Sequence, residues 1–325
     1  MAITFGAVSP DRLPQAGALF QKVKGGSSNP ISREATMTWK AYAPHPWFAE
    51  SRCRAIEKDG LIAAFGCIAP LRFLAEGQVV DSHQMIDWVA GDSIPGGGML
   101  LCRNCISEVG SMVATTASES ASAIFSRSRW FRATAPASYY RRVFRFWNPA
   151  HRDRKTPLRA ARDLLLQVKQ APLPDPRGWV ARRTSLSRVW QPADKCIALE
   201  RSLAWFRYLM ACPEAQVEAG ILEHQGQPCG HFLTARRGSR IRILDLIAEP
   251  AGEVAAFSAC LTLLRNEGAS EAQACSSLAS QQYVFAACGM RKFRQEPVWI
   301  ADPKRRLPDN LPIESSFLTG DAFYV

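Results

Sequence analysis

Two kinds of hydrophobic segment are missing from this sequence of 325 residues. A bilayer-spanning helix needs about 20 consecutive apolar residues, and the best candidate, residues 61–74, is broken by Pro70 and Arg72. The start of the chain, Met-Ala-Ile-Thr-Phe, has neither the basic residues nor the apolar segment of a secretory signal. The sequence therefore predicts a cytoplasmic protein with no membrane span.

Disulfide and metal-binding patterns are also missing. The ten cysteines are scattered along the chain, and Cys102 with Cys105 is the one close pair. A structural zinc site needs a second pair of cysteines or histidines at ligand spacing, and none follows. Since nothing directs export, we expect reduced cysteines packed as small apolar side chains, and no metal site.

Both common glycine motifs for nucleotide binding are absent. The sequence contains no Gly-x-Gly-x-x-Gly fingerprint of the nicotinamide type and no Gly-Lys-Ser/Thr of a P-loop. These absences argue against a dinucleotide-dependent oxidoreductase and against a P-loop nucleotidase.

What the chain does have is an ordinary globular composition, with 47% apolar and 21% charged residues. Its length favours two domains of about 150 residues each. A basic stretch with Pro172, Pro174 and Pro176 near its end is typical of a connection between domains. We therefore predict a first domain over residues 1–150, a linker over 151–178 and a second domain over 179–325.

The charge balance is basic. Lys and Arg number 40 against 29 Asp and Glu, a net charge of +11, which favours polyanionic partners. Many arginines fall between Arg127 and Arg162, interleaved with Trp130, Tyr139, Tyr140 and Trp147. This stretch either binds single-stranded nucleic acid by charge and stacking, or forms a strand edge and a solvated linker.

Secondary-structure signals in the first half place one glycine loop between a strand and a helix. The residues before about position 47 predict mostly helix, and Lys58-Asp59-Gly60 predicts a hairpin joining strands 54–57 and 61–68. A strand over 83–90 comes next, then the glycine loop and a helix over 98–109. A strand (112–116), a helix (118–129), a strand (131–147) and a linker helix (158–170) follow.

The second half repeats this order. It has a hairpin signal at Gln225-Gly226, a strand over 240–247, a helix over 253–266, a strand over 269–275 and a helix ending near 288. Setting Asp87 against Asp245 aligns the helices and strands of both halves at one constant offset. Internal duplication is the economical explanation.

The glycine loop has the composition of a phosphate-binding turn. It contains Pro95, Gly96, Gly97 and Gly98, followed by Met99. A helix N-terminus leaves backbone N–H groups without intrahelical partners and carries partial positive charge, and glycine lets a phosphate approach closely. The alternative is a loop that only turns the chain.

This loop resembles the pyrophosphate loop of the GNAT acyltransferases, in which Arg or Gln precedes a Gly-x-Gly/Ala pattern and a leucine follows. Here the loop runs from Ser93 to Gly98, with Leu101 after it, and residues 118–131 resemble that family's second helix and next strand. The resemblance implies an α/β fold of two tandem GNAT-like domains, each a mixed, mostly antiparallel twisted sheet flanked by helices. This tandem arrangement is similar to that of proteins associated with bacterial polysaccharide and cell-envelope biosynthesis.

The sequence departs from the family's pattern at three places. Ser93 replaces the basic or amide residue, Phe125 stands where many members have a tyrosine that acts as general acid, and Arg129-Trp130 replaces Gly-Phe. In the second half, Val254, Ala255 and Ala256 occupy the places of the three glycines, which predicts that this half has lost the cofactor.

The resemblance also implies acetyl-CoA or another acyl-CoA as the cofactor. Its pantetheine arm would pair with the strand at residues 86–90, with an oxyanion-stabilising N–H near Val89. The residues expected to contact the coenzyme are Trp88, Val89, Ala90, Ser93, Pro95, Gly96, Gly97, Gly98, Met99, Ser118 and Phe125.

Three residues beside the loop strands are candidates for the general base: Asp87, Glu119 and His83. Asp87 and Glu119 each have a structural alternative. Asp87 has a counterpart in the second half, which favours a structural role. Glu119 is equally suited to stabilise the first turn of a helix, and Trp88 is equally suited to the core.

The predicted activity is acyl transfer from a CoA thioester to an amine or hydroxyl of a small acceptor, with an amino sugar as the example that the family implies. Two alternatives stay open. One is a Fem-type transferase that takes its acyl group from charged tRNA. The other is a catalytically silent module that binds nucleic acid through residues 127–162.

Overall fold

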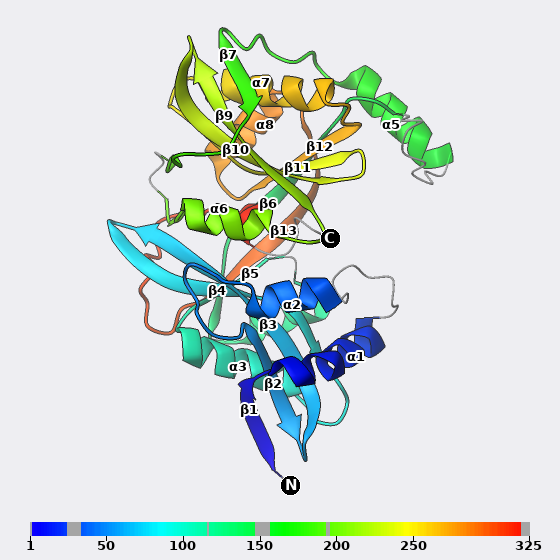
Figure 1. Cartoon of the computed structure of the whole chain (residues 1–325), viewed down its shortest axis with the longest axis vertical. Helices are drawn as coiled ribbons and strands as arrows, with labels where there is room; N and C mark the ends of the chain where they lie inside the picture. Colours follow the sequence, from blue (N-terminus) through cyan, green and yellow to red (C-terminus); the bar gives the residue numbers. More distant parts are fainter. Residues whose placement is uncertain (1, 25–33, 116, 147–156, 193–195, 320–325) are drawn as a thin grey trace.

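The computed structural model describes residues 2–24, 34–115, 117–146, 157–192 and 196–319 (Figure 1). Its N-terminal half begins with a strand, which the expectation of helix before position 47 missed, and then follows the predicted order. The elements of this half are β1 (Ile3–Ala7), η1 (Pro10–Arg12), α1 (Leu13–Lys24), α2 (Glu34–Tyr42), β2 (Cys53–Lys58), β3 (Leu61–Ala75), β4 (Gln78–Ala90), α3 (Gly97–Val109), β5 (Met112–Ala114), α4 (Glu119–Arg127) and β6 (Phe131–Val143).

The C-terminal half repeats the order strand, helix, strand, helix, strand at its end. Its elements are α5 (Pro157–Lys169), β7 (Trp179–Arg183), β8 (Ala198–Leu199), α6 (Leu203–Met210), β9 (Gln216–His224), β10 (Gln227–Arg237), β11 (Arg240–Ala248), α7 (Glu253–Asn266), β12 (Glu271–Ser276), α8 (Ala279–Ala287), β13 (Arg291–Ala301) and η3 (Phe317–Thr319). The helix α7 has the bounds that the sequence predicts.

One continuous sheet joins the two halves. Its strand order is β1-β2-β3-β4-β5-β13-β6-β12-β11-β10-β9-β7, and β8 pairs with β3. Among the described strand pairs, β4–β5 and β11–β12 are parallel and the others in this order are antiparallel. The mixed, mostly antiparallel sheet with flanking helices confirms the predicted fold class.

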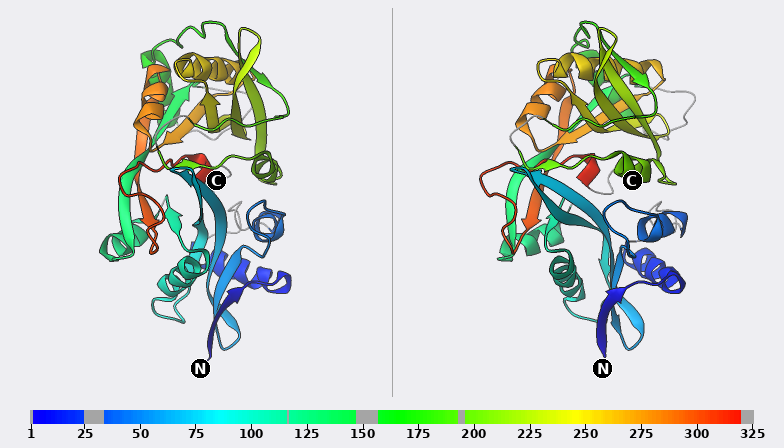
Figure 2. Two further views of the ribbon diagram at one scale, coloured as in Figure 1. Left: turned by 90° about the vertical axis from the view of Figure 1, so that its left-hand side faces the viewer. Right: turned by 60° about the vertical axis from the view of Figure 1, so that its left-hand side comes forward.

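The centre of the sheet is built by an exchange of strands. The last strand of the C-terminal half, β13, lies between β5 and β6 of the N-terminal half, while β6 pairs with β12. Figures 1 and 2 show β6 and β13 running side by side from one half into the other. Each half therefore completes the sheet of its neighbour.

The apolar stretch at residues 61–74 forms the long strand β3, which is buried on both faces. Eleven of its 15 residues are buried and three more are half-buried, because α1 and α3 both pack against it. A strand covered on both faces has a nearly continuous apolar run rather than an alternating one. No helix in the described ranges has both the length and the apolar character to cross a bilayer.

The largest apolar cluster contains residues of both halves. Phe73 of β3, Trp205 of α6 and Leu244 of β11 all belong to it. Two smaller clusters lie under α7 and α8 and under α3 and α4. The halves thus share a core in addition to the sheet.

Candidate active site

Strands β4 and β5 pair over two residues only and then separate. The paired residues are His83 with Met112 and Gln84 with Val113, after which β4 continues to Ala90 while β5 ends at Ala114. A cavity of about 300 Å³ opens where they diverge. It is lined by Phe20, Lys24, Gln84, Met85, Ile86, Asp87, Trp88, Met112, Ala114, Thr115, Ala117, Ser118, Ala121 and Phe125.

A polar contact closes the narrow end of this cavity. The Gln84 side-chain amide donates to Thr115 Oγ1 at 3.0 Å, and the Thr115 hydroxyl lies 3.2 Å from Gln84 Oε1. Both side chains are buried. The contact marks the point beyond which the strands stay paired, so we call it the floor of the cavity.

The strand β4 contains a bulge next to the cavity. The pairing between β3 and β4 shifts between Phe65 and Cys67, and Asp87 on β4 has φ of 54°, in the left-handed region. The Asp87 carboxylate forms a buried ion pair with Lys40 of α2. A non-glycine residue with this φ costs free energy, so the ion pair helps to hold the bulge in place.

The bulge determines which backbone amides face the cavity. Gly91 N–H donates to the Ala63 carbonyl on β3 at 2.9 Å. Since N–H groups alternate sides along a strand, the Val89 amide also faces β3, and those of Trp88 and Ala90 face the edge that β5 leaves open. The amides that face the open edge thus flank Val89, near which the sequence predicts an oxyanion-stabilising N–H.

The glycine loop ends beside the same cavity. Gly96 is the N-cap of α3 with φ of 72°, and no side chain caps the helix there. Gly97 N–H donates to the Ile94 carbonyl and Leu100 N–H to the Gly96 carbonyl, whereas Gly98 and Met99 stand in the first turn, where amides have no intrahelical partner. Pro95 and Gly96 are exposed, so this helix N-terminus is open to a ligand.

Gly98 also permits a close approach to the cavity wall. A Cβ atom at this position would stand 3.1 Å from Trp88 Nε1. The Trp88 ring stacks on Phe125 with centroids 5.9 Å apart, and both rings line the cavity. Loop, wall and open strand edge thus meet at one place.

A lysine lies next to the loop where the GNAT pattern has a basic residue. Lys58 Nζ, at the end of β2, donates to the Ser93 carbonyl at 2.9 Å. The sequence prediction did not include Lys58, because 35 residues separate it from Ser93 and only the sheet brings them together.

The three predicted bases have different surroundings. Asp87 lines the cavity, and Glu119 is exposed as the first residue of α4, beside the cavity-lining N-cap Ser118. His83 is 0% exposed and does not line the cavity. Burial lowers the pKa of His83 to about 3, so its ring is neutral at ordinary pH.

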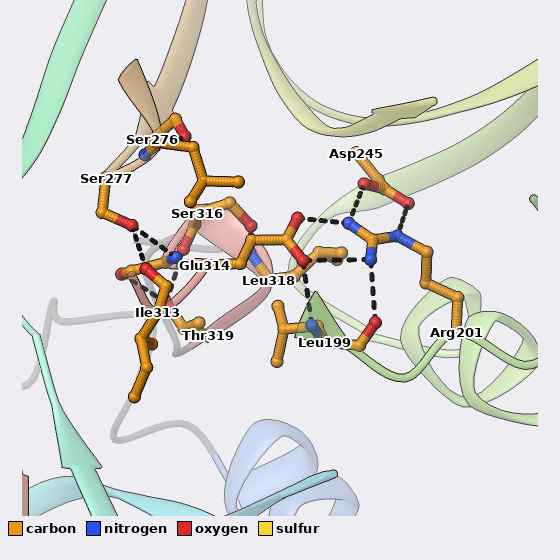
Figure 3. A network of polar contacts seen from close by, with 12 residues as sticks. Leu199, Arg201, Asp245, Ser276, Ser277, Ile313, Glu314, Ser316, Leu318 and Thr319 are labelled. Atoms are coloured by element: carbon orange, nitrogen blue, oxygen red, sulfur yellow. Dashed lines mark hydrogen bonds and ion pairs between the residues drawn. The ribbon is translucent and has the colours of Figure 1, made fainter. Parts of the chain in front are cut away.

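The equivalent pair in the C-terminal half, β11 and β12, is occupied by the chain itself. The segment 313–319 runs against both strands (Figure 3), with Ser277 Oγ donating to the Ile313 carbonyl at 2.6 Å and Ser315 N–H donating to Ser277 Oγ at 2.8 Å. The cavity left there measures about 50 Å³, and Glu314 and Ser316 form part of its lining.

A buried ionic network fixes this closure. Arg201 donates from Nε and Nη2 to the two oxygens of Asp245, both at 2.8 Å, and from Nη1 to Glu314 Oε2 at 3.1 Å (Figure 3). His231 Nε2 lies 2.9 Å from Asp245 Oδ2. All four side chains are buried.

The helix α7 starts beneath other residues. Its N-cap, Gly252, lies under Trp179, since a Cβ atom on Gly252 would stand 2.2 Å from the Trp179 ring. The first helical residue is the acidic Glu253, and Ala255 and Ala256 follow at the places of two loop glycines. An acidic first turn beneath an indole does not suit a phosphate.

A second cavity, of about 30 Å³, lies between the halves on the other side of the bulge. Lys40 lines it while its partner Asp87 lines the larger cavity, and Ile86 lines both. Its other walls include Trp39, His45, Trp205, Tyr208 and Leu318. Trp39 and Tyr208, one from each half, stack with centroids 4.7 Å apart.

Several residues of the arginine-rich stretch are engaged within the protein. Arg141 pairs with the buried Asp163, Arg142 donates to the carbonyls of Cys288 and Ala171, and Arg132 pairs with Asp309. Tyr139 and Tyr140 are buried. The predicted alternative of a stacking surface for nucleic acid also included Trp147, which lies outside the described residues.

The sequence itself matches no family model and no curated protein. Its structure resembles a GCN5-related N-acetyltransferase from Anabaena variabilis ATCC 29413, with a TM-score of 0.57 and 12% identity over 92% of this chain and 72% of that one. A probable N-acyltransferase from Enterococcus faecalis V583 gives a TM-score of 0.57 at 9% identity, with the same coverage.

A third similar structure is the N-myristoyltransferase of Saccharomyces cerevisiae with bound myristoyl-CoA and inhibitors. Its TM-score is 0.55 at 9% identity, over 92% of this chain and 80% of that one. Identities this low establish the fold alone. The chain therefore has the fold of the GNAT acyltransferases.

Proposed function

We propose that this protein is an acyl-CoA-dependent acyltransferase that moves a short acyl group, acetyl in the first instance, to an amine or hydroxyl of a small acceptor. One observation carries the proposal. The N-terminal half keeps an open strand pair beside an uncovered helix N-terminus, whereas the C-terminal half has closed both.

The residues around the cavity suit a coenzyme A ester. The first-turn amides of Gly98 and Met99 would hold the diphosphate, with Lys58 supplying the cation that Ser93 lacks. The open edge at Trp88 and Ala90 offers backbone groups to an amide-bearing arm, as in strand pairing. Trp88, Phe125 and Ser118 form the wall, as the sequence resemblance implies.

The floor of the cavity favours a short acyl group. A long hydrocarbon chain would have to pass the buried Gln84–Thr115 contact and break its hydrogen bonds. Leaving buried polar groups without partners costs about 1–3 kcal/mol each. This supports acetyl over a long-chain acyl group.

The acceptor would approach the thioester from the cavity between the halves. This cavity lies across the bulge from the acyl cavity, and the Lys40–Asp87 pair connects the two. At about 30 Å³ this cavity would have to widen to admit a ring-bearing acceptor such as an amino sugar, because its Trp39 and Tyr208 rings stack on each other.

When bound, acyl-CoA supplies a thioester carbonyl, to which the acceptor nitrogen or oxygen bonds while the carbon–sulfur bond breaks and the thiol leaves with a proton. In this proposal the amides of Trp88 and Ala90 would donate to the carbonyl oxygen, and orientation in the cleft would supply much of the rate. Asp87 and Glu119 are the candidates to take the acceptor's proton.

The C-terminal half would serve to wall the acceptor side. It contributes Trp205, Tyr208, Leu209 and Leu318 to the cavity between the halves. We therefore assign coenzyme binding to the predicted domain 1–150 and a supporting role to the predicted domain 179–325.

Thermal shift with acetyl-CoA tests the proposal directly. Since a ligand that binds only the folded state stabilises it by mass action, acetyl-CoA at about 100 times its Kd should add about 2.7 kcal/mol. Acetyl-CoA and CoA should both raise Tm, and free pantetheine should do so far less. The absence of any shift with acetyl-CoA, together with a salt-sensitive shift with RNA, would instead support the nucleic-acid alternative.

A further inference from the structure

The helix α5 turns its apolar side away from the protein. Four exposed residues recur at the spacing of one helix face: Leu158, Ala161, Leu165 and Val168. The exposed fraction is 85% for Leu158, 58% for Leu165 and 74% for Val168. Leu164, 41% exposed, widens this face. A surface helix normally buries such a stripe.

Polar contacts hold the opposite side of α5 against the body. Asp163 is 1% exposed and lies 3.5 Å from Arg141 of β6, and Gln167 Oε1 accepts from the Phe146 amide at 3.1 Å. Arg291 Nη2 donates to the Lys169 carbonyl at 2.7 Å. The orientation of the helix is therefore set by these contacts, which keep its leucines in solvent. Figure 1 shows α5 at the periphery of the C-terminal half.

The exposed stripe is bordered by cations. Arg162 and Lys169 are exposed on α5, and Arg291 is exposed next to its C-terminal end. An aliphatic stripe with basic residues at its edges suits the interface of an anionic bilayer, where apolar side chains enter the acyl boundary and cations meet the headgroups. The protein's net charge of +11 acts in the same direction.

Two other occupants fit this face less well. In a two-fold dimer, Arg162 and Lys169 would face their own copies, and like charges across an interface repel. A helix of 13 residues is about 20 Å long, too short to supply the roughly 800 Å² per partner of a standard interface. Single-stranded nucleic acid needs exposed aromatic rings, and this face carries leucine and valine instead.

We propose that α5 is a membrane-docking helix that binds the surface of an anionic lipid bilayer through Leu158, Leu165 and Val168, with Arg162, Lys169 and Arg291 at the headgroups. The proposal does not depend on the acyltransferase assignment. It gives the protein a place of action at the bilayer surface.

Co-sedimentation of the full chain with vesicles tests this proposal. Vesicles of equal parts phosphatidylglycerol and phosphatidylcholine should bind the protein, and vesicles of phosphatidylcholine alone should not. Binding should weaken steeply between low salt and about 0.5 M NaCl, because the electrostatic attraction is screened. Failure of the wild-type protein to sediment with the anionic vesicles overturns the proposal.

Three variants locate the binding face. Leu165→Glu should weaken vesicle binding by at least about tenfold, since its buried methylenes are lost and a charge is added. The double variant Arg162→Ala/Lys169→Ala should weaken it by more than about tenfold, because each cation contributes roughly fivefold. Val79→Glu, which changes an apolar residue of the β3–β4 hairpin with 54% exposure, is the matched control and should bind as wild type.

All of the substituted side chains are exposed, so folding is expected to survive, and circular dichroism checks it. Leu165→Glu binding as well as wild type would overturn the assignment to α5. Light scattering that finds a wild-type dimer and a Leu165→Glu monomer would assign the face to a second copy instead. If the wild-type protein retained RNA but did not bind vesicles, and Leu165→Glu lost the RNA, the exposed face of α5 would be assigned to nucleic acid.

Discussion

Asp87 and Asp245 stand at equivalent places in the two parallel strand pairs, and each forms an ion pair with a buried cation of its own half. Lys40 of α2 is the partner of Asp87, and Arg201, just before α6, is the partner of Asp245. Only Asp87 lies in a bulge with positive φ beside an open cavity. A bulge and a buried ion pair occur at this place in both halves, because the pairing of β10 with β11 also shifts next to Asp245. The left-handed backbone at Asp87 and the open cavity belong to the N-terminal half.

Arg201→Met should destabilise the protein strongly. The substitution leaves the buried carboxylates of Asp245 and Glu314 without their guanidinium, which costs roughly 3–5 kcal/mol. Thermal unfolding should show a Tm lower by on the order of 10 °C. Arg182→Met is the control, because the Arg182 side chain is 62% exposed and its ion pair with Glu223 should contribute less than about 1 kcal/mol. Equal losses in the two variants would contradict the structural importance of the network.

Asp87→Asn separates a structural role from a catalytic one. We expect a lower Tm, because Lys40 loses its carboxylate partner, together with an acetyl-CoA-induced shift that persists, because the loop at Gly98 is untouched. The measurement is Tm with and without acetyl-CoA, alongside turnover with a panel of amines. An unchanged Tm with turnover abolished would identify Asp87 as the proton acceptor instead.

Met99→Glu should remove coenzyme binding without harming the fold. An acidic residue in the first turn favours the helix dipole by about 0.3–1 kcal/mol, so Tm without ligand should be unchanged or slightly higher. The same charge would repel a diphosphate at the start of α3, and we expect the Kd for acetyl-CoA to rise at least about tenfold. Met99→Gln, of the same size but uncharged, is the control measured by the same titration. Equal affinity in the two variants would place the coenzyme elsewhere.

Replacing Gln84 and Thr115, which form the floor of the cavity, should change which acyl group the protein prefers. In Gln84→Leu/Thr115→Val both partners of the hydrogen-bonded pair become apolar, a change that is nearly neutral for stability. Butyryl-CoA should then gain about tenfold over acetyl-CoA in kcat/KM relative to wild type, from two buried methylenes of about 0.8 kcal/mol each. Thr115→Ser keeps a hydroxyl at the floor and should keep the wild-type preference. An unchanged preference in the double variant would mean that the acyl group lies away from Gln84.

Two buried histidines should make stability depend on pH. Burial lowers the pKa of both His83 and His45 to about 3, whereas the unfolded values are near 6.5. Below pH 6.5 the unfolded chain binds protons that the folded chain does not, so stability is full above this pH and falls as pH decreases toward 3. Each histidine should contribute about 2 kcal/mol of loss between pH 6.5 and pH 5. His83→Leu should reduce the difference in unfolding free energy between pH 7 and pH 5 measured in urea, and an unchanged difference would contradict it.

Much of the local structure could be predicted because it depends on neighbouring residues. The turn at Asp59-Gly60 and the helix start at Gly96 both use left-handed backbone, which the sequence signals through glycine. The offset between Asp87 and Asp245 identified the repeat of helices and strands. The start of the chain was less informative, since β1 is a short edge strand beside a 3-10 helix and a helix.

The long-range arrangements could not be predicted. No local feature of β13 indicates that it lies between β5 and β6, because strand pairing is decided by the whole sheet. A lysine such as Lys40 is usually exposed, and only the packing of α2 reveals its buried ion pair with Asp87. Likewise the sequence indicated that α7 had lost its glycines, but the covering Trp179 and the segment 313–319 come from distant parts of the chain.

The crossing of β6 and β13 has a consequence for how the protein folds. Each of these two strands has both of its neighbours in the other half, since β13 lies between β5 and β6 while β6 lies between β13 and β12, as in a domain-swapped pair of subunits. A polypeptide severed near the connection would leave two fragments, each with an unfilled slot where its neighbour's strand belongs. We expect such fragments to be recovered by complementation with each other rather than as independent folding units.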